Sequence, residues 1–212
     1  MGSEIRPRRA PKRSDTFWIP TYYSNTPDMR HVSGWKCDTH EEMSFEEAGE
    51  KLLEGGDFDG QFPSSLKLWI DDTAAPIADY LGNALNWTIM SDRLVRHLWA
   101  LIEDCVQIFP APLFFKDTET RVPGYQVVNV TKVLDCVDRV RSVPWYDDED
   151  VLGGYSELCI DAARTNGAHI FRYLVTPNYV CPRPVCTFNL VNSLVGKGFN
   201  GTAFRPCICA ET

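Results

Sequence analysis

The stretch from Phe62 to Cys136 constrains the fold of this chain more than any other part of its sequence. A proline turn is followed by a short apolar run, two segments with helical spacing, two runs rich in Val, Ile and aromatic residues, and the acidic sequence LDCVD. Such runs, bounded by Gly and Pro turns, are typical of strands. Because strand-like runs follow one another directly, we expect an α+β fold in which a few helices pack against an antiparallel-rich sheet.

Four segments have the periodicity or the end signals of helices. Residues 91–105 give the clearest pattern, because apolar residues recur at i, i+4 and i+7 and Ser91 can cap the first turn. Residues 44–56 begin with a capping box of Ser44 and Glu47 and end at a double glycine. The other two predicted helices cover residues 74–85 and 184–198.

Strands are predicted where β-branched and aromatic residues gather between turn residues. Residues 16–24 are expected to form an edge strand, since Pro20 cannot donate a hydrogen bond to a central ladder. Asn166 and Gly167 favour a tight hairpin turn between the two runs that flank them. The remaining predicted strands cover residues 66–70, 106–115, 125–137, 157–162, 169–175 and 202–210.

The charge of the chain is unevenly divided. The formal net charge is −8, but the first 13 residues hold five basic residues against one acidic residue, so the remainder carries −12. We interpret residues 1–15 as a basic, disordered leader before a single domain over residues 16–212. An acidic body repels nucleic acid and speeds association with a basic protein, although solubility alone also explains such a charge.

The sequence predicts a cytoplasmic protein that binds no membrane and no nucleic acid. No run approaches the roughly 18 consecutive apolar residues that a membrane span requires. The N-terminus also lacks the apolar core of a signal peptide.

Motifs for catalysis or cofactor binding are absent from the sequence, so we expect no catalytic residue, no cofactor and no metal. Two metal hypotheses nevertheless stay open. In one, a metal-dependent hydrolase uses His31, Cys37 and His40 with a distant carboxylate. In the other, zinc stabilises a structural scaffold through cysteines near the C-terminus. These cysteines are Cys181, Cys186, Cys207 and Cys209.

The other cysteines and histidines have simpler explanations. Cys105, Cys136 and Cys159 lie in apolar runs, where a free thiol packs as a small hydrophobic group and disulfides are rare in a reducing cytoplasm. His97 borders the apolar stripe of its helix and is expected to be partly packed. His169 begins a predicted strand and could act as a base, but no nucleophile stands beside it in the sequence.

An aromatic pair precedes the densest acidic run of the chain. Trp145 and Tyr146 are followed by four carboxylates at residues 147–150. Aromatic residues are enriched in interface hot spots, and a ring beside carboxylates suits contact with Arg or Lys on a basic partner. The alternative interpretation is a mobile charged loop with one packed aromatic residue. A second acidic candidate is the segment of residues 41–50.

Four segments of the sequence, taken in order, resemble one known family. They read FPSSLKLWIDD, SDRLVRHLWALIEDCVQIFPAPL, YQVVNVTKVLDCVD and HIFRYLVTPNYVCPRPVCTFNLVNSLVGKGFNGTAFRP. This order is similar to that of the bacterial polymorphic-toxin immunity protein family number eleven, and the resemblance covers residues 57–206. The double proline in CPRPVCTF departs from the usual family pattern before the final helix.

The resemblance implies an immunity protein, which binds and neutralises a cognate toxin that is commonly encoded by a neighbouring gene. We therefore expect a stoichiometric inhibitor, not an enzyme, that occludes the active site of the toxin. An acidic inhibitor suits a nuclease toxin, because carboxylates could take the place of phosphates in its basic cleft. The candidate toxin-binding residues are Trp145, Tyr146, Asp147, Asp148, Glu149, Asp150, Glu46 and Glu47.

Overall fold

The computed structural model describes most of the chain. The described residues are 17–22, 32–36, 45–58, 62, 66–71, 75–83 and 85–207. Several residues that the sequence singled out lie outside this set: the leader 1–15, His31, Cys37, His40, Ser44 and Cys209. Within the described residues, three α-helices pack against sheets whose strands are mostly antiparallel, which confirms the predicted α+β class.

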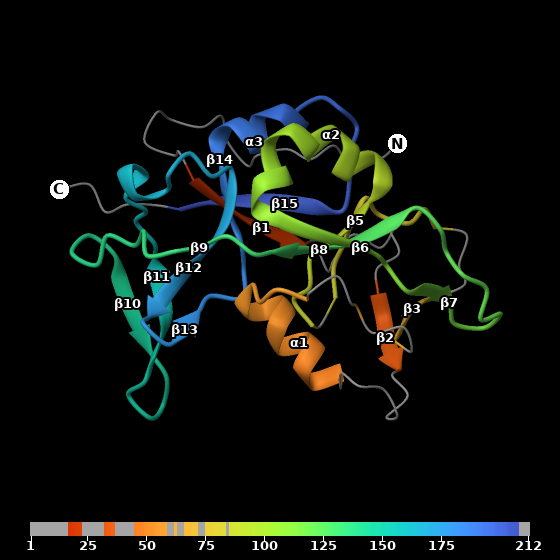
Figure 1. Cartoon of the computed structure of the whole chain (residues 1–212), viewed down its shortest axis with the longest axis horizontal. Helices are drawn as coiled ribbons and strands as arrows, with labels where there is room; N and C mark the ends of the chain where they lie inside the picture. The colour runs from red at the N-terminus through yellow and green to blue at the C-terminus, as the bar shows by residue number, and fades with distance from the viewer. Residues whose placement is uncertain are drawn as a thin grey trace.

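A four-stranded antiparallel sheet contributes side chains to two separate hydrophobic clusters. Side chains alternate between its two faces, as they do along any strand. Met90 and Val128 therefore face the first cluster, whereas Ile89 and Val127 face the second. The strands, in order across the sheet (Figure 1), are β4 (Tyr80–Leu81), β5 (Ile89–Ser91), β8 (Tyr125–Val130) and β6 (Val106–Pro110).

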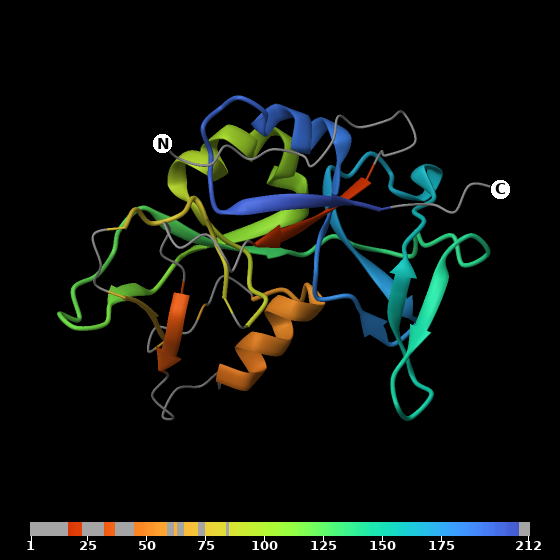
Figure 2. The ribbon, with the colours of Figure 1, turned by 180° about the vertical axis from the view of Figure 1, so that it is seen from behind.

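The first cluster lies between this sheet, two helices and a larger sheet. Helices α2 (Asp92–Ile102) and α3 (Phe188–Leu194) lie side by side on one face of the molecule (Figures 1 and 2), and the Nε2 atom of His97 lies 2.8 Å from the carbonyl oxygen of Ser193. The strands of the larger sheet, in order, are β13 (Tyr179–Val180), β12 (Ile170–Thr176), β14 (Val185–Thr187), β1 (Phe17–Tyr22) and β15 (Thr202–Pro206), with β9 (Val133–Leu134) added in parallel to β12.

The second cluster is covered by helix α1 (Phe45–Glu54) and a three-stranded sheet. Leu52 of the helix is buried with Leu68 and Leu113 of the sheet. The strands of this sheet, in order, are β2 (Val32–Lys36), β3 (Lys67–Ile70) and β7 (Leu113–Phe115), and β3 pairs with β7 in parallel. No helix among the described residues is long and apolar enough to cross a membrane.

Three of the four predicted helices are confirmed. The hydroxyl of Ser91 accepts a hydrogen bond from the backbone N–H of Leu94 and caps α2, as predicted. Gly55 has a φ of 75° and ends α1. Helix α3 begins only at Phe188, because the residues before it form β14 and Thr187 caps the helix.

The helix predicted over residues 74–85 is wrong. Its described residues form β4 and two turns, because their polar side chains bind the backbone and other elements. The side chain of Asn83 exchanges hydrogen bonds with the backbone N–H and carbonyl of Trp87, and thereby closes a turn. The carboxylate of Asp79 accepts a hydrogen bond from the Ser91 hydroxyl at 2.6 Å, which draws this segment to the start of α2.

Two strand predictions also need correction. β1 is not an edge strand, since it pairs with both β14 and β15. β14 pairs only with Phe17 and Trp18 and ends before Pro20. The missing backbone N–H of Pro20 therefore costs no hydrogen bond between strands, which explains why proline is tolerated there. Asn166 and Gly167 adopt turn conformations but connect a 3-10 turn, Ala162–Arg164, to β12, and the predicted hairpin is therefore absent from this segment.

Candidate functional site

The predicted acidic loop lies at the tip of a two-stranded hairpin. Strands β10 (Val143–Tyr146) and β11 (Leu152–Glu157) pair only with each other among the described residues. The hairpin stands at one end of the molecule, and its loop extends past β13 (Figures 1 and 2). Tyr155 connects it to the body, because its ring lies 6.4 Å from the ring of Tyr173 in the first cluster.

Trp145 has a fixed position on this hairpin. It pairs with Gly154, and its indole lies over Gly153 and Gly154, where any Cβ on Gly153 would overlap the ring. The glycines thus provide a flat backbone surface for the indole. Trp145 remains 47% exposed and Tyr146 remains 56% exposed, so both rings offer surface to a partner.

One of the four acidic residues shapes the loop, and the other three face solvent. The Oδ1 atom of Asp147 accepts hydrogen bonds from the backbone N–H groups of Glu149 at 3.0 Å and Val151 at 2.9 Å. Asp147 therefore acts mainly as a positioning residue. The side chains of Asp148, Glu149 and Asp150 are exposed on the loop that it holds.

Exposed hydrophobic side chains are concentrated on the same hairpin. Nine large hydrophobic side chains are exposed among the described residues, and five of these belong to the hairpin or to the turn before it. Large apolar groups in contact with water mark interaction surfaces when they cluster. The five are Val140, Val143, Trp145, Tyr146 and Val151.

The base of the hairpin is tied to the body by polar contacts. The backbone N–H of Asp138 donates to the carbonyl of Cys159, and the N–H of Cys159 donates to the hydroxyl of Ser142. The carboxylate of Asp138 accepts a hydrogen bond from the Arg141 side chain, which lowers the pKa of Asp138. Cys159 is buried as expected, but its sulfur forms a disulfide bond. The prediction of a free thiol there is wrong, because a sequence does not show which sulfurs approach each other.

The second acidic candidate is separate from the hairpin. Glu46 and Glu47 lie in the first turn of α1, and Figure 1 shows that this end of the helix points away from β10 and β11. The side chain of Glu47 is exposed. The structure therefore brings together six of the eight candidate residues and leaves these two apart.

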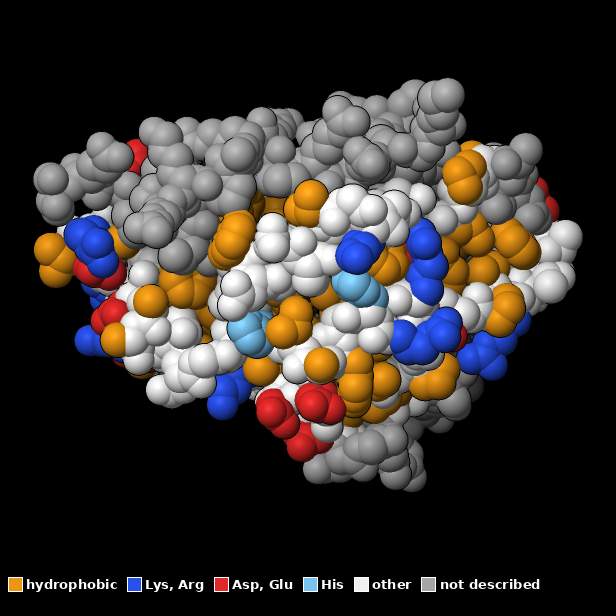
Figure 3. Space-filling model, turned by 90° about the horizontal axis from the view of Figure 1, so that it is seen from above, with side chains coloured by type: hydrophobic (Ala, Val, Ile, Leu, Met, Phe, Trp, Pro, Cys, Tyr) orange, Lys and Arg blue, Asp and Glu red, His pale blue; other side chains and the backbone are white. Residues whose placement is uncertain are grey.

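The face over α2 and α3 does not continue the acidic surface. Figure 3 shows that its described Lys and Arg side chains are spread among white and orange atoms, while Asp and Glu gather mainly at one edge. The side chain of His97 is exposed, so the expected partial packing is wrong, although its ring centroid lies 5.0 Å from that of Phe199. The Nδ1 atom of His169 lies 2.9 Å from the hydroxyl of Thr187, which also caps α3, so this pair belongs to the helix start.

Neither metal hypothesis gains support from the part of the chain that the structure describes. No three His, Cys, Asp or Glu side chains come together there as metal ligands. Burial raises the pKa of the Cys207 thiol to about 12 and also raises the pKa of Cys186, so both are neutral thiols at neutral pH when no metal is bound. The hydrolase residues His31, Cys37 and His40 lie outside the described set.

Sequence reasoning missed a polar network around the buried carboxylate of Asp79, next to β4. The Asp79 carboxylate accepts hydrogen bonds from Arg93, and this contact raises the pKa of Arg93. Asn200 binds the same segment, since its side-chain oxygen accepts from the N–H of Asp79 at 2.8 Å. The Arg93 guanidinium also lies 4.9 Å from the ring of Phe199. No local signal marks these residues, because they are distant in the sequence and meet only in the fold.

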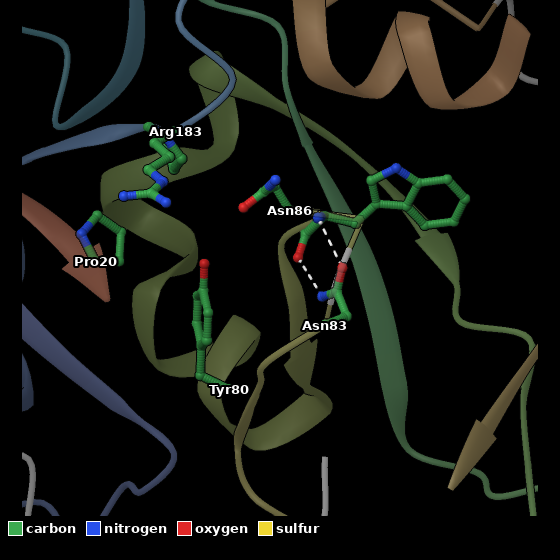
Figure 4. Close-up of a pocket in the computed structure, with 7 residues that line it drawn as sticks. Pro20, Tyr80, Asn83, Asn86 and Arg183 are labelled. Carbon is green, nitrogen blue, oxygen red and sulfur yellow. Dashed lines mark hydrogen bonds between the residues drawn. The ribbon is translucent and has the colours of Figure 1, made fainter. Parts of the chain in front are cut away.

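A cavity of about 210 Å³, also missed, opens beside β1 and β4 (Figure 4). Tyr80, Trp87 and two prolines line it. Figure 4 shows the Arg183 guanidinium, the Tyr80 hydroxyl and the Asn86 amide turned toward the same space, while Asn83 is engaged with Trp87.

Comparison with known protein families identifies a family for this chain. The sequence model described as Immunity protein family (Imm11) matches residues 21–208. No curated protein matches the chain. The matched range contains the second hydrophobic cluster, the β10–β11 hairpin, the first cluster except Phe17, Trp18 and Ile19, and all the residues named for the cavity except Pro20.

Proposed function

The chain belongs to the Imm11 immunity protein family, and we propose that it neutralises a nuclease toxin by covering the active site of the toxin with the β10–β11 hairpin. Membership of the family implies a toxin-neutralising function. The choice of the hairpin rests on one observation: exposed aromatic and acidic side chains are concentrated on it. The proposed partner is a cognate toxin encoded by a neighbouring gene, and the complex forms in the cytoplasm without nucleic acid or membrane.

The chemistry of the loop suits a basic cleft. In the proposed complex, Asp148, Glu149 and Asp150 occupy positions that the phosphates of the substrate would otherwise take. Trp145 and Tyr146 stack on Arg or Lys side chains at the rim of the cleft. Since Asp147 already holds the loop, little conformational entropy is lost on binding. The net charge of −8 adds long-range attraction to a basic toxin.

The contact is made by side chains and not by strand addition. The outer edge of β10 contains Pro144, which has no N–H to offer a strand from the toxin. Proline on an exposed edge also discourages unspecific pairing between sheets. In the alternative arrangement, the toxin contacts Glu46 and Glu47 at the start of α1.

Co-expression with the product of the neighbouring gene tests the function. We expect the toxin alone to arrest growth, and the pair to survive and to co-purify at a fixed ratio. A neighbouring product that is harmless alone and forms no complex would contradict the proposed pairing.

Charge reversal tests the surface. The variant Asp148→Lys/Glu149→Lys/Asp150→Lys should bind the purified toxin at least about tenfold more weakly, because charge-assisted contacts become repulsive. The control Glu103→Lys/Asp104→Lys/Asp117→Lys replaces three exposed acidic residues elsewhere on the surface. It therefore changes the net charge by the same amount as the hairpin variant. If the hairpin variant and the control lose the same amount of toxin affinity, the hairpin contributes only long-range attraction. A larger loss in Glu46→Lys/Glu47→Lys would favour α1 as the contact.

A further inference from the structure

Two polar side chains that have no partner among the described residues face the cavity beside β4. Neither the Arg183 guanidinium nor the Asn86 side-chain amide makes a hydrogen bond or ion pair with any described residue. This is unusual for Arg183, because the chain carries 29 acidic residues against 21 Lys and Arg. Asn86 is held in the left-handed region, with a φ of 58°, by the turn that Asn83 closes. The fold thus fixes the position of this amide.

A third unpaired polar group lines the space next to the cavity. Thr88 is 2% exposed, and its hydroxyl oxygen has no hydrogen-bond partner. It lines a narrow space that shares Pro20, Tyr80 and Pro184 with the cavity. Buried hydroxyl groups are normally satisfied, so this one is an unused polar group next to the cavity.

The size of the cavity limits what it can hold. About 210 Å³ is below the ~300 Å³ at which pockets for nucleotides and drug-sized ligands begin. It suits one side chain or a molecule of amino-acid size. The walls formed by Trp87, Pro20 and Pro184 suit the methylene groups of such a ligand, and the donors on Arg183 and Asn86 suit an anionic head.

We propose that this cavity is a binding site for a carboxylate, received by the Arg183 guanidinium and the Asn86 amide, with the aliphatic part of the ligand against Trp87. The carboxylate belongs either to a small free acid or to an acidic side chain of a partner protein. This inference does not depend on the hairpin or on the toxin, because the ligand chemistry follows from the unpaired donors alone.

NMR titration of the full chain tests the site. The probes are sodium acetate, for a free acid, and N-acetylglutamate N-methylamide, for a protein side chain. We expect shifts of the side-chain signals of Arg183, Asn86 and Trp87 in both series relative to sodium chloride at equal ionic strength. Equal affinities would identify a site for free acids, whereas tighter binding of the glutamate derivative would identify a site for a partner side chain.

Uncharged and substituted controls make the test decisive. The glutamine analogue should bind about tenfold more weakly than the glutamate derivative, and Arg183→Gln should weaken the glutamate derivative by a similar factor. Arg183→Lys keeps the charge but not the planar guanidinium, so its affinity for the glutamate derivative should lie between those of the unsubstituted chain and Arg183→Gln. Arg121→Gln, an exposed arginine that does not line the cavity, should bind normally. Absent shifts, equal binding of the glutamine analogue, or equal losses in the two Gln variants would overturn the proposal.

Discussion

Arg172 carries a charge into the interior without a carboxylate to balance it. The side chain is 1% exposed, and no described carboxylate contacts it. It donates hydrogen bonds to the carbonyl oxygens of Leu52, Val130 and Pro182. Burial lowers the pKa of Arg172 to about 10, so the guanidinium stays charged at neutral pH. Its acceptors come from α1, β8 and the segment before β14, which makes Arg172 a link between both hydrophobic clusters.

Replacing this guanidinium should be costly even when its volume is kept. In Arg172→Met, three carbonyl oxygens lose their donor inside the protein, and we expect the free energy of unfolding to fall by about 3 kcal/mol or more. Urea denaturation measures this change. Arg205→Met, at an exposed position of β15, is the control and should change stability by less than about 0.5 kcal/mol. Native stability in Arg172→Met would show that the carbonyl contacts contribute little.

The buried thiols make stability depend on pH in the alkaline range. Burial raises the pKa of Cys136 and of Cys207 to about 12, against 9.0 for an unburied thiol. The folded state therefore holds these protons more tightly than the unfolded state, and the resulting stability is complete below pH 9. Between pH 9 and 12 it should be lost at up to about 1.4 kcal/mol per pH unit for each thiol. Urea denaturation at a series of pH values should give a shallower slope for Cys136→Ala, whereas an unchanged slope would assign the effect to other groups.

Among the secondary-structure elements, the β10–β11 hairpin depends on a contact between a ring and glycine. In Gly153→Ala, the new Cβ overlaps the indole of Trp145 and must displace it. We expect a shifted Trp145 indole signal in NMR spectra and at least about tenfold weaker toxin binding, while the melting temperature hardly changes because neither Gly153 nor Trp145 belongs to a hydrophobic cluster. In the control Gly49→Ala, the Cβ meets Trp87 at an ordinary 4.0 Å within α1. An unmoved Trp145 signal in Gly153→Ala would contradict the role of the glycines.

Elements were predictable from the sequence where the deciding chemistry lies within one segment. The stripe and cap of α2 and the glycines after α1 are local signals, and both helices form as predicted. The helix prediction for the segment around Asp79 was wrong because the partners of Asp79, Arg93 and Asn200, come from other parts of the chain. The acidic loop was recognised by composition alone, but the pairing that places Trp145 on glycine depends on strand register.

At the scale of the whole molecule, one sheet holds the two hydrophobic clusters together. Val127 and Val128 are neighbours on β8, yet each faces a different cluster. Arg172 adds a polar link across the same boundary. A core divided in this way can still unfold as one unit, because neither cluster can lose its side of the sheet without exposing the other. The single domain over residues 16–212 remains a prediction that this arrangement favours.

Hydrogen exchange distinguishes one cooperative unit from two. Val127→Ala removes apolar contacts only from the second cluster, and Val128→Ala only from the first, at a cost of about 2 kcal/mol each. If the chain unfolds as a unit, either variant should accelerate amide exchange equally in α2, which packs on the first cluster, and in β3, which packs on the second. Acceleration confined to β3 in Val127→Ala and to α2 in Val128→Ala would mean that the clusters open separately. In that case the shared sheet would act as a boundary between two folding units and not as their common core.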